Sequence, residues 1–68
     1  MRTFHIDIVM GNDDFQFPND WRYEVARILG TVVKSLDRGD LPKDEDFHRP
    51  LGDINGNRVG WVSTEVEK

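Results

Sequence analysis

The most informative segment of this chain is Asp53-Ile54-Asn55-Gly56-Asn57-Arg58-Val59-Gly60-Trp61. It fits two structures, a tight β-hairpin or the start of a calcium-binding loop of the EF-hand type. The calcium loop needs glycine at its sixth position and a bidentate glutamate at its twelfth, where this chain has Arg58 and Thr64. The Asn-Gly pair instead suits the centre of a type I′ turn, because both residue types tolerate positive φ. The sequence therefore predicts a hairpin here and no metal site.

The register of this hairpin stays open. A turn centred on residues 55–56 and a turn centred on residues 56–57 both match the sequence, and they pair different residues of the two strands. Gly52 and Gly60 weaken the flanking strands. Each of these glycines therefore predicts a β-bulge, or a place where another backbone or a large side chain packs closely.

The residues before this stretch predict one strand and one helix. Apolar and polar residues alternate over residues 2–10, which predicts a half-buried strand with one apolar face: Phe4, Ile6, Ile8 and Met10. An amphipathic helix follows, with an apolar stripe that would lie on the sheet: Val25, Ile28, Leu29, Val32, Val33 and Leu36. Asn19 or Asp20 is the predicted N-cap, and Gly39 is the predicted end of the helix.

Two more strands complete the predicted fold. Residues 39–50 form a polar connection with little regular structure, and residues 51–54 and 58–66 form the two arms of the hairpin. The order strand, helix, strand, strand predicts an α+β fold. We expect a three-stranded, mostly antiparallel sheet with one helix packed on one face, in a single small domain that includes all of residues 1–68.

Size and composition restrict how this domain is stabilised and where it acts. A core of 68 residues is marginal by itself, and the chain has no cysteine for a disulfide or a thiolate zinc site. The remaining ways to stabilise such a domain are idealised packing, a homodimer or another bound partner. The apolar runs are too short for a membrane span, and the alternating N-terminus does not resemble a secretory signal, so a cytoplasmic location in the host cell is expected. A net charge of −4 argues against a general nucleic-acid binder.

The histidines are the candidates for catalysis or metal binding. His5 and Asp7 lie two residues apart on one strand face, and His48 is near Asp44 and Asp46 in the sequence. Such pairs can ligate a metal or form a base with its orienting carboxylate. Neither histidine has a serine or cysteine beside it as a nucleophile, and no glycine-rich phosphate loop is present. The sequence therefore predicts no enzymatic activity and no cofactor.

Surface contacts are the remaining candidates. Two Trp, one Tyr and four Phe exceed what so small a core easily buries, so some aromatic residues are expected at a protein interface. The predicted partner contacts combine an exposed aromatic, an acidic loop and the turn: Trp61, Asp44, Glu45, Asp46, Asn55 and Asn57. A basic line on the outer helix face supports the alternative of a nucleic-acid or nucleotide-binding module: Arg27, Lys34 and Arg38. Glu24 also lies on that face and can pair with Arg27.

Three short motifs, spread over most of the chain, follow one pattern: Asn-x-x-Phe, Glu-x-Ala-Arg-Ile-Leu and Asp-x-Asn-Gly-Asn-x-Val-Gly. The residues that carry it are Asn12, Phe15, Glu24, Ala26, Arg27, Ile28, Leu29, Asp53, Asn55, Gly56, Asn57, Val59 and Gly60. In this pattern the chain resembles a group of small proteins of tailed phages and other mobile elements. Asp13 and Asp14 depart from that group, which usually has small residues there. The resemblance implies a genomic context and no catalytic mechanism. We therefore expect a non-enzymatic phage or prophage accessory protein that binds a host or phage protein, with inhibition of a host defence system or a host enzyme as one such role.

Overall fold

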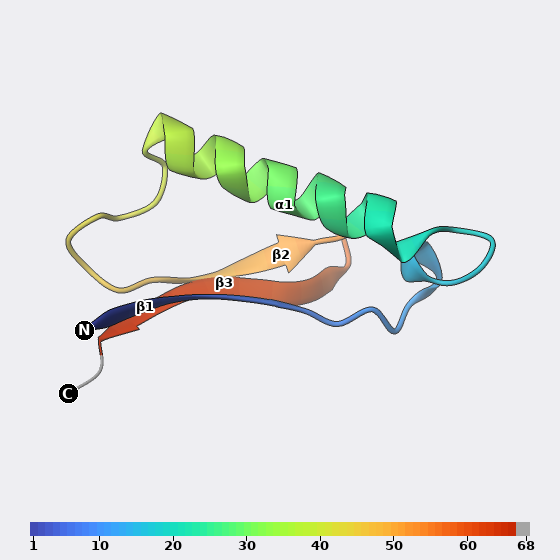
Figure 1. Ribbon diagram of the computed structural model, residues 1–68, viewed down its shortest axis with the longest axis horizontal. Helices are drawn as coiled ribbons and strands as arrows, with labels where there is room; N and C mark the ends of the chain where they lie inside the picture. The colour runs from blue at the N-terminus through green and yellow to red at the C-terminus, as the bar shows by residue number, and fades with distance from the viewer. Residues whose placement is uncertain (67–68) are drawn as a thin grey trace.

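The chain folds into a three-stranded antiparallel sheet with one helix across one of its faces (Figure 1). The computed structural model describes residues 1–66. Its elements are, in chain order, β1 (Arg2–Ile8), the single 3₁₀ turn η1 (Asp13–Phe15), α1 (Trp21–Arg38), β2 (His48–Gly52) and β3 (Arg58–Val66). This architecture confirms the predicted α+β fold.

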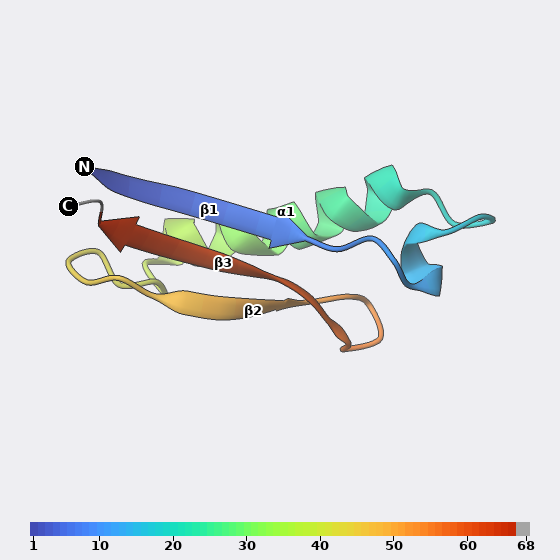
Figure 2. The same cartoon turned by 90° about the horizontal axis from the view of Figure 1, so that it is seen from below.

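The last strand, β3, occupies the centre of the sheet, with β1 on one side and β2 on the other (Figure 2). Gly60 of β3 lies opposite both Ile8 and Leu51. A Cβ atom on Gly60 would lie 1.7 Å from the carbonyl oxygen of Asp7, so only glycine lets β1 approach β3 this closely. The register of β2 against β3 shifts between Leu51 and Gly52. The predictions of a bulge and of close backbone packing are therefore both confirmed.

Helix α1 has the ends that the sequence predicts. The Asp20 side chain accepts a hydrogen bond from the Arg22 backbone N–H at 3.0 Å, which satisfies one of the free donors of the first turn. Gly39 ends the helix in the left-handed conformation, with φ of 72°, and its N–H donates to the Leu36 carbonyl. Six apolar side chains, contributed by α1, by η1 and by the sheet, form the buried core: Phe15, Ile28, Val32, Leu51, Val59 and Val62.

The hairpin differs from the prediction in bounds and in turn type. The first arm spans His48–Gly52 instead of residues 51–54, and Pro50 is tolerated because β2 is an edge strand. Asp53 and Asn57 close the loop, with the Asp53 N–H donating to the Asn57 carbonyl at 2.8 Å. Gly56 has φ of 85°, but no non-glycine residue among residues 1–66 has positive φ, which excludes a type I′ turn on Asn55 and Gly56. The loop therefore has three central residues, and neither predicted register forms.

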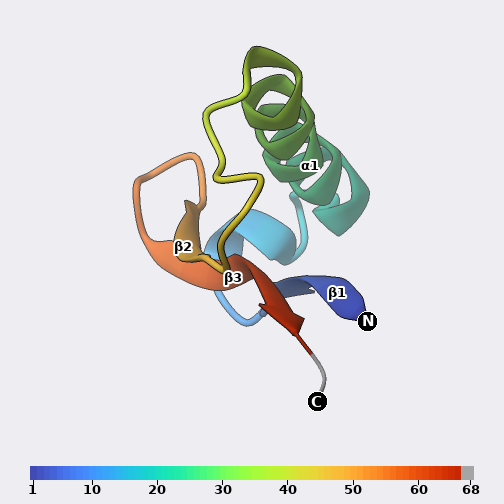
Figure 3. The ribbon, with the colours of Figure 1, turned by 90° about the vertical axis from the view of Figure 1, so that its left-hand side faces the viewer.

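The predicted apolar stripe of the helix is only half covered. Figures 2 and 3 show α1 crossing the sheet obliquely, with its C-terminal half displaced from the start of β1. Ile28 and Val32 are buried, but the neighbouring side of the helix stays exposed, and so does the facing part of β1. We call these exposed residues the apolar strip: Phe4, Ile6, Leu29, Val33 and Leu36. Phe4 and Leu36 line one shallow pocket of about 380 Å³, which connects the two sides of the strip.

Candidate functional site

A buried carboxylate organises the hairpin loop. The Asp53 side chain is only 5% exposed, and it accepts hydrogen bonds from the backbone N–H groups of Asn55 and Asn57 at 2.9 and 2.8 Å. It also accepts bonds from the side-chain amides of Asn57 and Asn12 at 3.1 and 2.7 Å. The Asn55 amide in turn donates to the Asp14 carboxylate. Hydrogen bonds from Asn12 and to Asp14 therefore connect the hairpin loop to the segment that precedes the helix.

The two aspartates of this network have opposite electrostatic environments. Burial by itself would raise the pKa of Asp53, but hydrogen bonding with Asp14 and from Asn57 and Asn55 lowers that pKa to about 2. The Asp53 carboxylate raises the pKa of Asp14 above its usual value, and burial adds to this effect. The two carboxylates therefore titrate as a coupled pair, in which the N–H donors favour the ionised form of Asp53.

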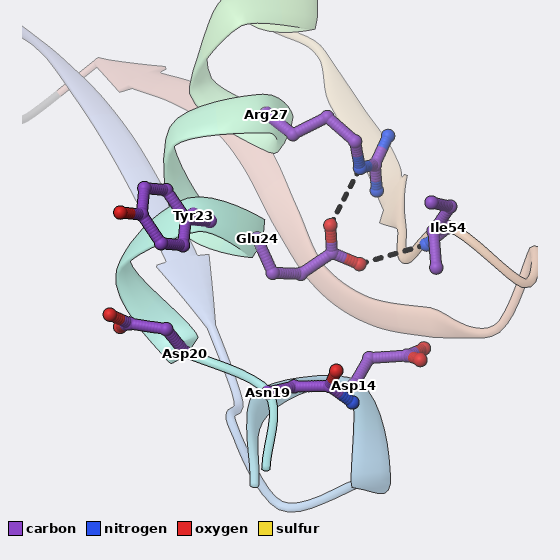
Figure 4. A pocket seen from close by; sticks show the side chains of 7 residues that line it. All are labelled: Asp14, Asn19, Asp20, Tyr23, Glu24, Arg27 and Ile54. Atoms are coloured by element: carbon purple, nitrogen blue, oxygen red, sulfur yellow. Dashed lines mark hydrogen bonds and ion pairs between the residues drawn. The ribbon is translucent and has the colours of Figure 1, made fainter. Parts of the chain in front are cut away.

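A second buried carboxylate connects the helix to the hairpin. Glu24 is only 8% exposed, and it accepts a hydrogen bond from Arg27 Nε at 2.6 Å and another from the Ile54 N–H at 2.9 Å (Figure 4). Arg27 also donates to the Gly52 carbonyl at 3.1 Å. The Arg27 guanidinium is the main cause of the lowered pKa of Glu24. The Glu24–Arg27 pair is confirmed, but its placement on a solvated helix face is wrong, because the end of β2 and the hairpin lie against it.

These groups line a shallow pocket of about 320 Å³ at the start of the helix, with seven lining residues: Asp14, Asn19, Asp20, Tyr23, Glu24, Arg27 and Ile54 (Figure 4). In residues 1–66, no buried side-chain nitrogen or oxygen lacks a hydrogen-bond partner. The same part of the chain has no cluster of three or more side chains suited to hold a metal ion. The donors and acceptors are thus matched to one another, and they join the hairpin loop both to the segment before the helix and to α1.

The residues behind the phage-protein resemblance meet in this region. Its polar members form the two carboxylate networks: Asn12, Glu24, Arg27, Asp53, Asn55 and Asn57. Three of its apolar members lie in the core: Phe15, Ile28 and Val59. Gly60 is the position on β3 at which the backbone of the neighbouring strand β1 comes closest. The residues of the motif therefore serve the fold of this chain. The side chains of Asn55 and Asn57, which were predicted to contact a partner, form hydrogen bonds within the chain.

The predicted acidic contact loop is connected to the start of β1. The Arg2 guanidinium donates to the Asp46 carboxylate at 3.2 Å, to the Lys43 carbonyl at 2.6 Å and to the Glu45 carbonyl. The side chains of Asp44 and Glu45 are exposed. This loop and the 53–57 turn lie at opposite ends of the sheet (Figure 1). The six predicted contact residues therefore do not form one patch.

Trp61 lies on the sheet face that the helix does not cover, because it alternates with the buried Val62. His48 packs on the Trp61 ring with centroids 4.1 Å apart and planes tilted by 38°. Arg58, on the same strand as Trp61, places its guanidinium over that ring, 4.9 Å from the ring centroid. We call Trp61, His48 and Arg58 the tryptophan cluster. Nothing in the sequence spacing indicates it, because β2 brings His48 to this face through strand pairing.

The other predicted site residues are separated or paired. His5 Nε2 lies 3.1 Å from a Glu65 carboxylate oxygen. Of the predicted basic line, Arg27 is bound to Glu24, and Arg38 forms an ion pair with a carboxylate two residues away at 3.1 Å. Lys34 is exposed on the helix. The structure therefore does not bring the three cations together as free groups.

Comparisons with protein-family models, with curated proteins and with solved structures find no match to this chain. The resemblance to small phage proteins therefore stays a prediction. Within residues 1–66, no helix has the length and apolar character that crossing a membrane requires.

Proposed function

We propose that this chain is a non-enzymatic phage or prophage accessory protein that acts by binding another protein, such as a host enzyme or a component of host defence. The sequence resemblance supports the genomic context. The observation that supports binding is the tryptophan cluster on the open face of the sheet. Trp and Arg are the residue types that most often dominate the energy of protein interfaces.

The shape around Trp61 also supports a binding role. Two shallow hollows, of about 420 and 350 Å³, share Arg58 and Trp61 among their lining residues. These two side chains therefore form a ridge with a depression on either side. Within residues 1–66, Arg58 has a cation–π contact and no ion pair. A partner that offers a flat apolar group to the ring and a carboxylate to the guanidinium would match this ridge.

A pair of tryptophan variants tests the proposal. Tagged wild-type chain, Trp61→Ala and Trp21→Ala are each exposed to host lysate, and the captured proteins are identified by mass spectrometry. Trp21 is the matched control, because it is a 49% exposed tryptophan on α1 and lies outside the cluster. We expect one host protein on the wild type and on Trp21→Ala, with binding to Trp61→Ala weakened by roughly 30-fold, the effect of losing a hot spot.

Calorimetry with the purified host protein then gives the affinities. Failure to capture any specific protein would contradict the proposed function. Equal affinity of Trp61→Ala and the wild type would reject the tryptophan cluster as the contact surface.

A further inference from the structure

We infer that two copies of this chain pair through β1, antiparallel, into one six-stranded sheet with both helices on the same face. This pairing uses the free backbone edge of β1 and the apolar strip, whereas the proposed function uses the tryptophan cluster, which shares only the neighbourhood of Asp7 with that edge. The inference therefore goes beyond the proposed function. The two edges of the three-stranded sheet differ in how well they are protected. Strand β2 is short, contains Pro50 and ends in a register shift, all of which oppose pairing. Strand β1 has seven residues, with neither proline nor lysine among them.

The direction of the β1 backbone groups follows from its pairing with β3. The Val9 N–H donates to the Val59 carbonyl at 2.7 Å. In an antiparallel pair, alternate residues direct both backbone groups to the partner strand, so the odd-numbered residues of β1 face β3. The even-numbered residues Phe4, Ile6 and Ile8 therefore direct their N–H and C=O groups to the free edge. Their side chains lie on the face that carries the helix, since Ile8 packs against the core.

This geometry restricts how two β1 strands can pair. Hydrogen bonding between the free edges must join even-numbered residues to even-numbered residues, and residues opposite one another project to the same face. A two-fold axis perpendicular to the sheet therefore places both helices on one side. The apolar strips of the two copies, which include Phe4 and Ile6 of β1, then meet across the axis. One contact covers both the open edge and the exposed apolar side chains.

The residues that lie opposite one another differ between the possible registers. With Ile6 on the axis, His5 of one copy lies opposite Asp7 of the other, twice, on the open face of the sheet. Phe4 then pairs with Ile8 on the helix face. With His5 on the axis, two imidazoles face each other instead. In the Ile6 register, the hydrogen bonds between the two copies involve only Phe4, Ile6 and Ile8. The next carbonyl that faces the free edge belongs to Met10, and it already accepts a hydrogen bond from the Gln16 side chain at 2.8 Å, so the ladder ends at Ile8.

The chain exposes more surface than is usual for its mass. One copy exposes 5215 Å². A folded monomer of 7.9 kDa is expected to expose about 4,400 Å², so this chain exposes about 800 Å² more. A standard protein interface buries about 800 Å² on each partner. The excess over the whole chain is thus of the same order as one half of a stable interface.

Single-cysteine variants test the register directly, because the chain has no cysteine of its own. Cysteine at the axis faces its own copy, and opposing residues of a bonded pair have Cα atoms about 5.5 Å apart, which a disulfide can bridge. After mild oxidation we expect Ile6→Cys to form a covalent dimer. The control Arg49→Cys, on the opposite edge strand, should stay monomeric on a denaturing gel. Efficient crosslinking of His5→Cys and not of Ile6→Cys would overturn the register.

The unmodified protein tests the pairing itself. Light scattering across a concentration series should give twice the 7.9 kDa mass of one chain, and the outward amides of Phe4, Ile6 and Ile8 should be protected from hydrogen exchange. Phe4→Lys, a change at an exposed residue of the apolar strip, places an unpaired cation opposite Ile8 of the second copy and should weaken the dimer by about tenfold or more with an unchanged circular dichroism spectrum. Trp61→Ala should leave the dimer intact, which separates this result from the test of the proposed function.

Three outcomes would overturn the inference. The first is a monomer at every concentration with freely exchanging β1 amides. The second is crosslinking of Arg49→Cys as efficient as that of Ile6→Cys. The third is protection of the β1 amides only when a captured host protein is added, which would show that a foreign strand occupies the edge.

Discussion

The same substitution, Gly→Ala, should have opposite effects at two positions of this chain. At Gly60 the added Cβ would lie 1.7 Å from the Asp7 carbonyl oxygen, where ordinary contacts begin near 3.4 Å. Strands β1 and β3 would have to separate locally by about 1.7 Å. At Gly30, in the middle of α1, the added Cβ would meet nothing within 4 Å. There the methyl group removes only the entropic disadvantage of a helical glycine.

The magnitudes follow from these contacts. Overpacking costs typically 1–3 kcal/mol, and weakening the two adjacent ladder hydrogen bonds adds about 1 kcal/mol each, so Gly60→Ala should cost about 3–5 kcal/mol. A domain of this length has a total stability of roughly 3–10 kcal/mol. Gly60→Ala should therefore lower the melting temperature by at least about 12 °C or prevent folding. Gly30→Ala should stabilise the domain by about 1 kcal/mol and raise the melting temperature by roughly 4–8 °C.

Thermal melts and urea titrations of both variants, at one protein concentration, measure the effect. Circular dichroism at the start of each melt shows whether the variant has folded. A free energy of unfolding for Gly60→Ala within 0.5 kcal/mol of the wild type, a difference usual for surface changes, would refute the close approach of β1 to β3. A destabilised Gly30→Ala would refute the open environment of that glycine.

Three further predictions concern the carboxylates and the basic line. Glu24→Ala should lower the free energy of unfolding by about 1–3 kcal/mol in urea, because the Ile54 N–H and Arg27 lose their shared acceptor, and Glu24→Gln should lose less. The free energy of unfolding should fall between about pH 4 and pH 2, because Asp53 and Glu24 have lowered pKa values in the folded state. Their stabilising effect is complete only when the pH is above the pKa values of the unfolded chain. The raised pKa of Asp14 acts in the opposite direction. Urea midpoints at several pH values measure this, and Asp53→Asn should flatten the curve. Anisotropy of labelled DNA and RNA should show no binding that weakens steeply with salt, because Arg27 is held by Glu24; a steep salt dependence would revive the nucleic-acid alternative.

Local patterns account for the elements that sequence reasoning predicted well. The N-cap Asp20 and the left-handed Gly39 act within a few residues of their own positions, so residue type alone indicates both ends of α1. Gly60 is a similar case, since a glycine in a strand already signals a bulge or a close approach. The first arm of the hairpin was misplaced because Pro50 argues against a strand, and only its position at the sheet edge makes it acceptable.

The candidate site depends on contacts between distant parts of the chain. The Asn12–Asp53 bond joins residues 41 positions apart, and the Glu24–Ile54 bond joins residues 30 positions apart. No periodicity or spacing encodes such pairs, so Glu24 was expected on a solvated face. The prediction of the turn type was wrong for a local reason, because the Asp53 carboxylate accepts bonds from N–H groups only two and four residues further along the chain. The Asp53 carboxylate holds the loop N–H groups, and this decides the conformation that Asn55 adopts.

The order of elements, the ends of the helix and the fold class can therefore be predicted from the amino-acid sequence, because hydrogen bonds within a few residues and apolar periodicity govern them. Three other features follow from the folded structure alone: which side of the helix stays open, which edge of the sheet is unprotected and where Trp61 meets its two neighbours. Each of these depends on the oblique crossing of α1 over the sheet and on the central place of β3. Both result from packing between residues far apart in the chain.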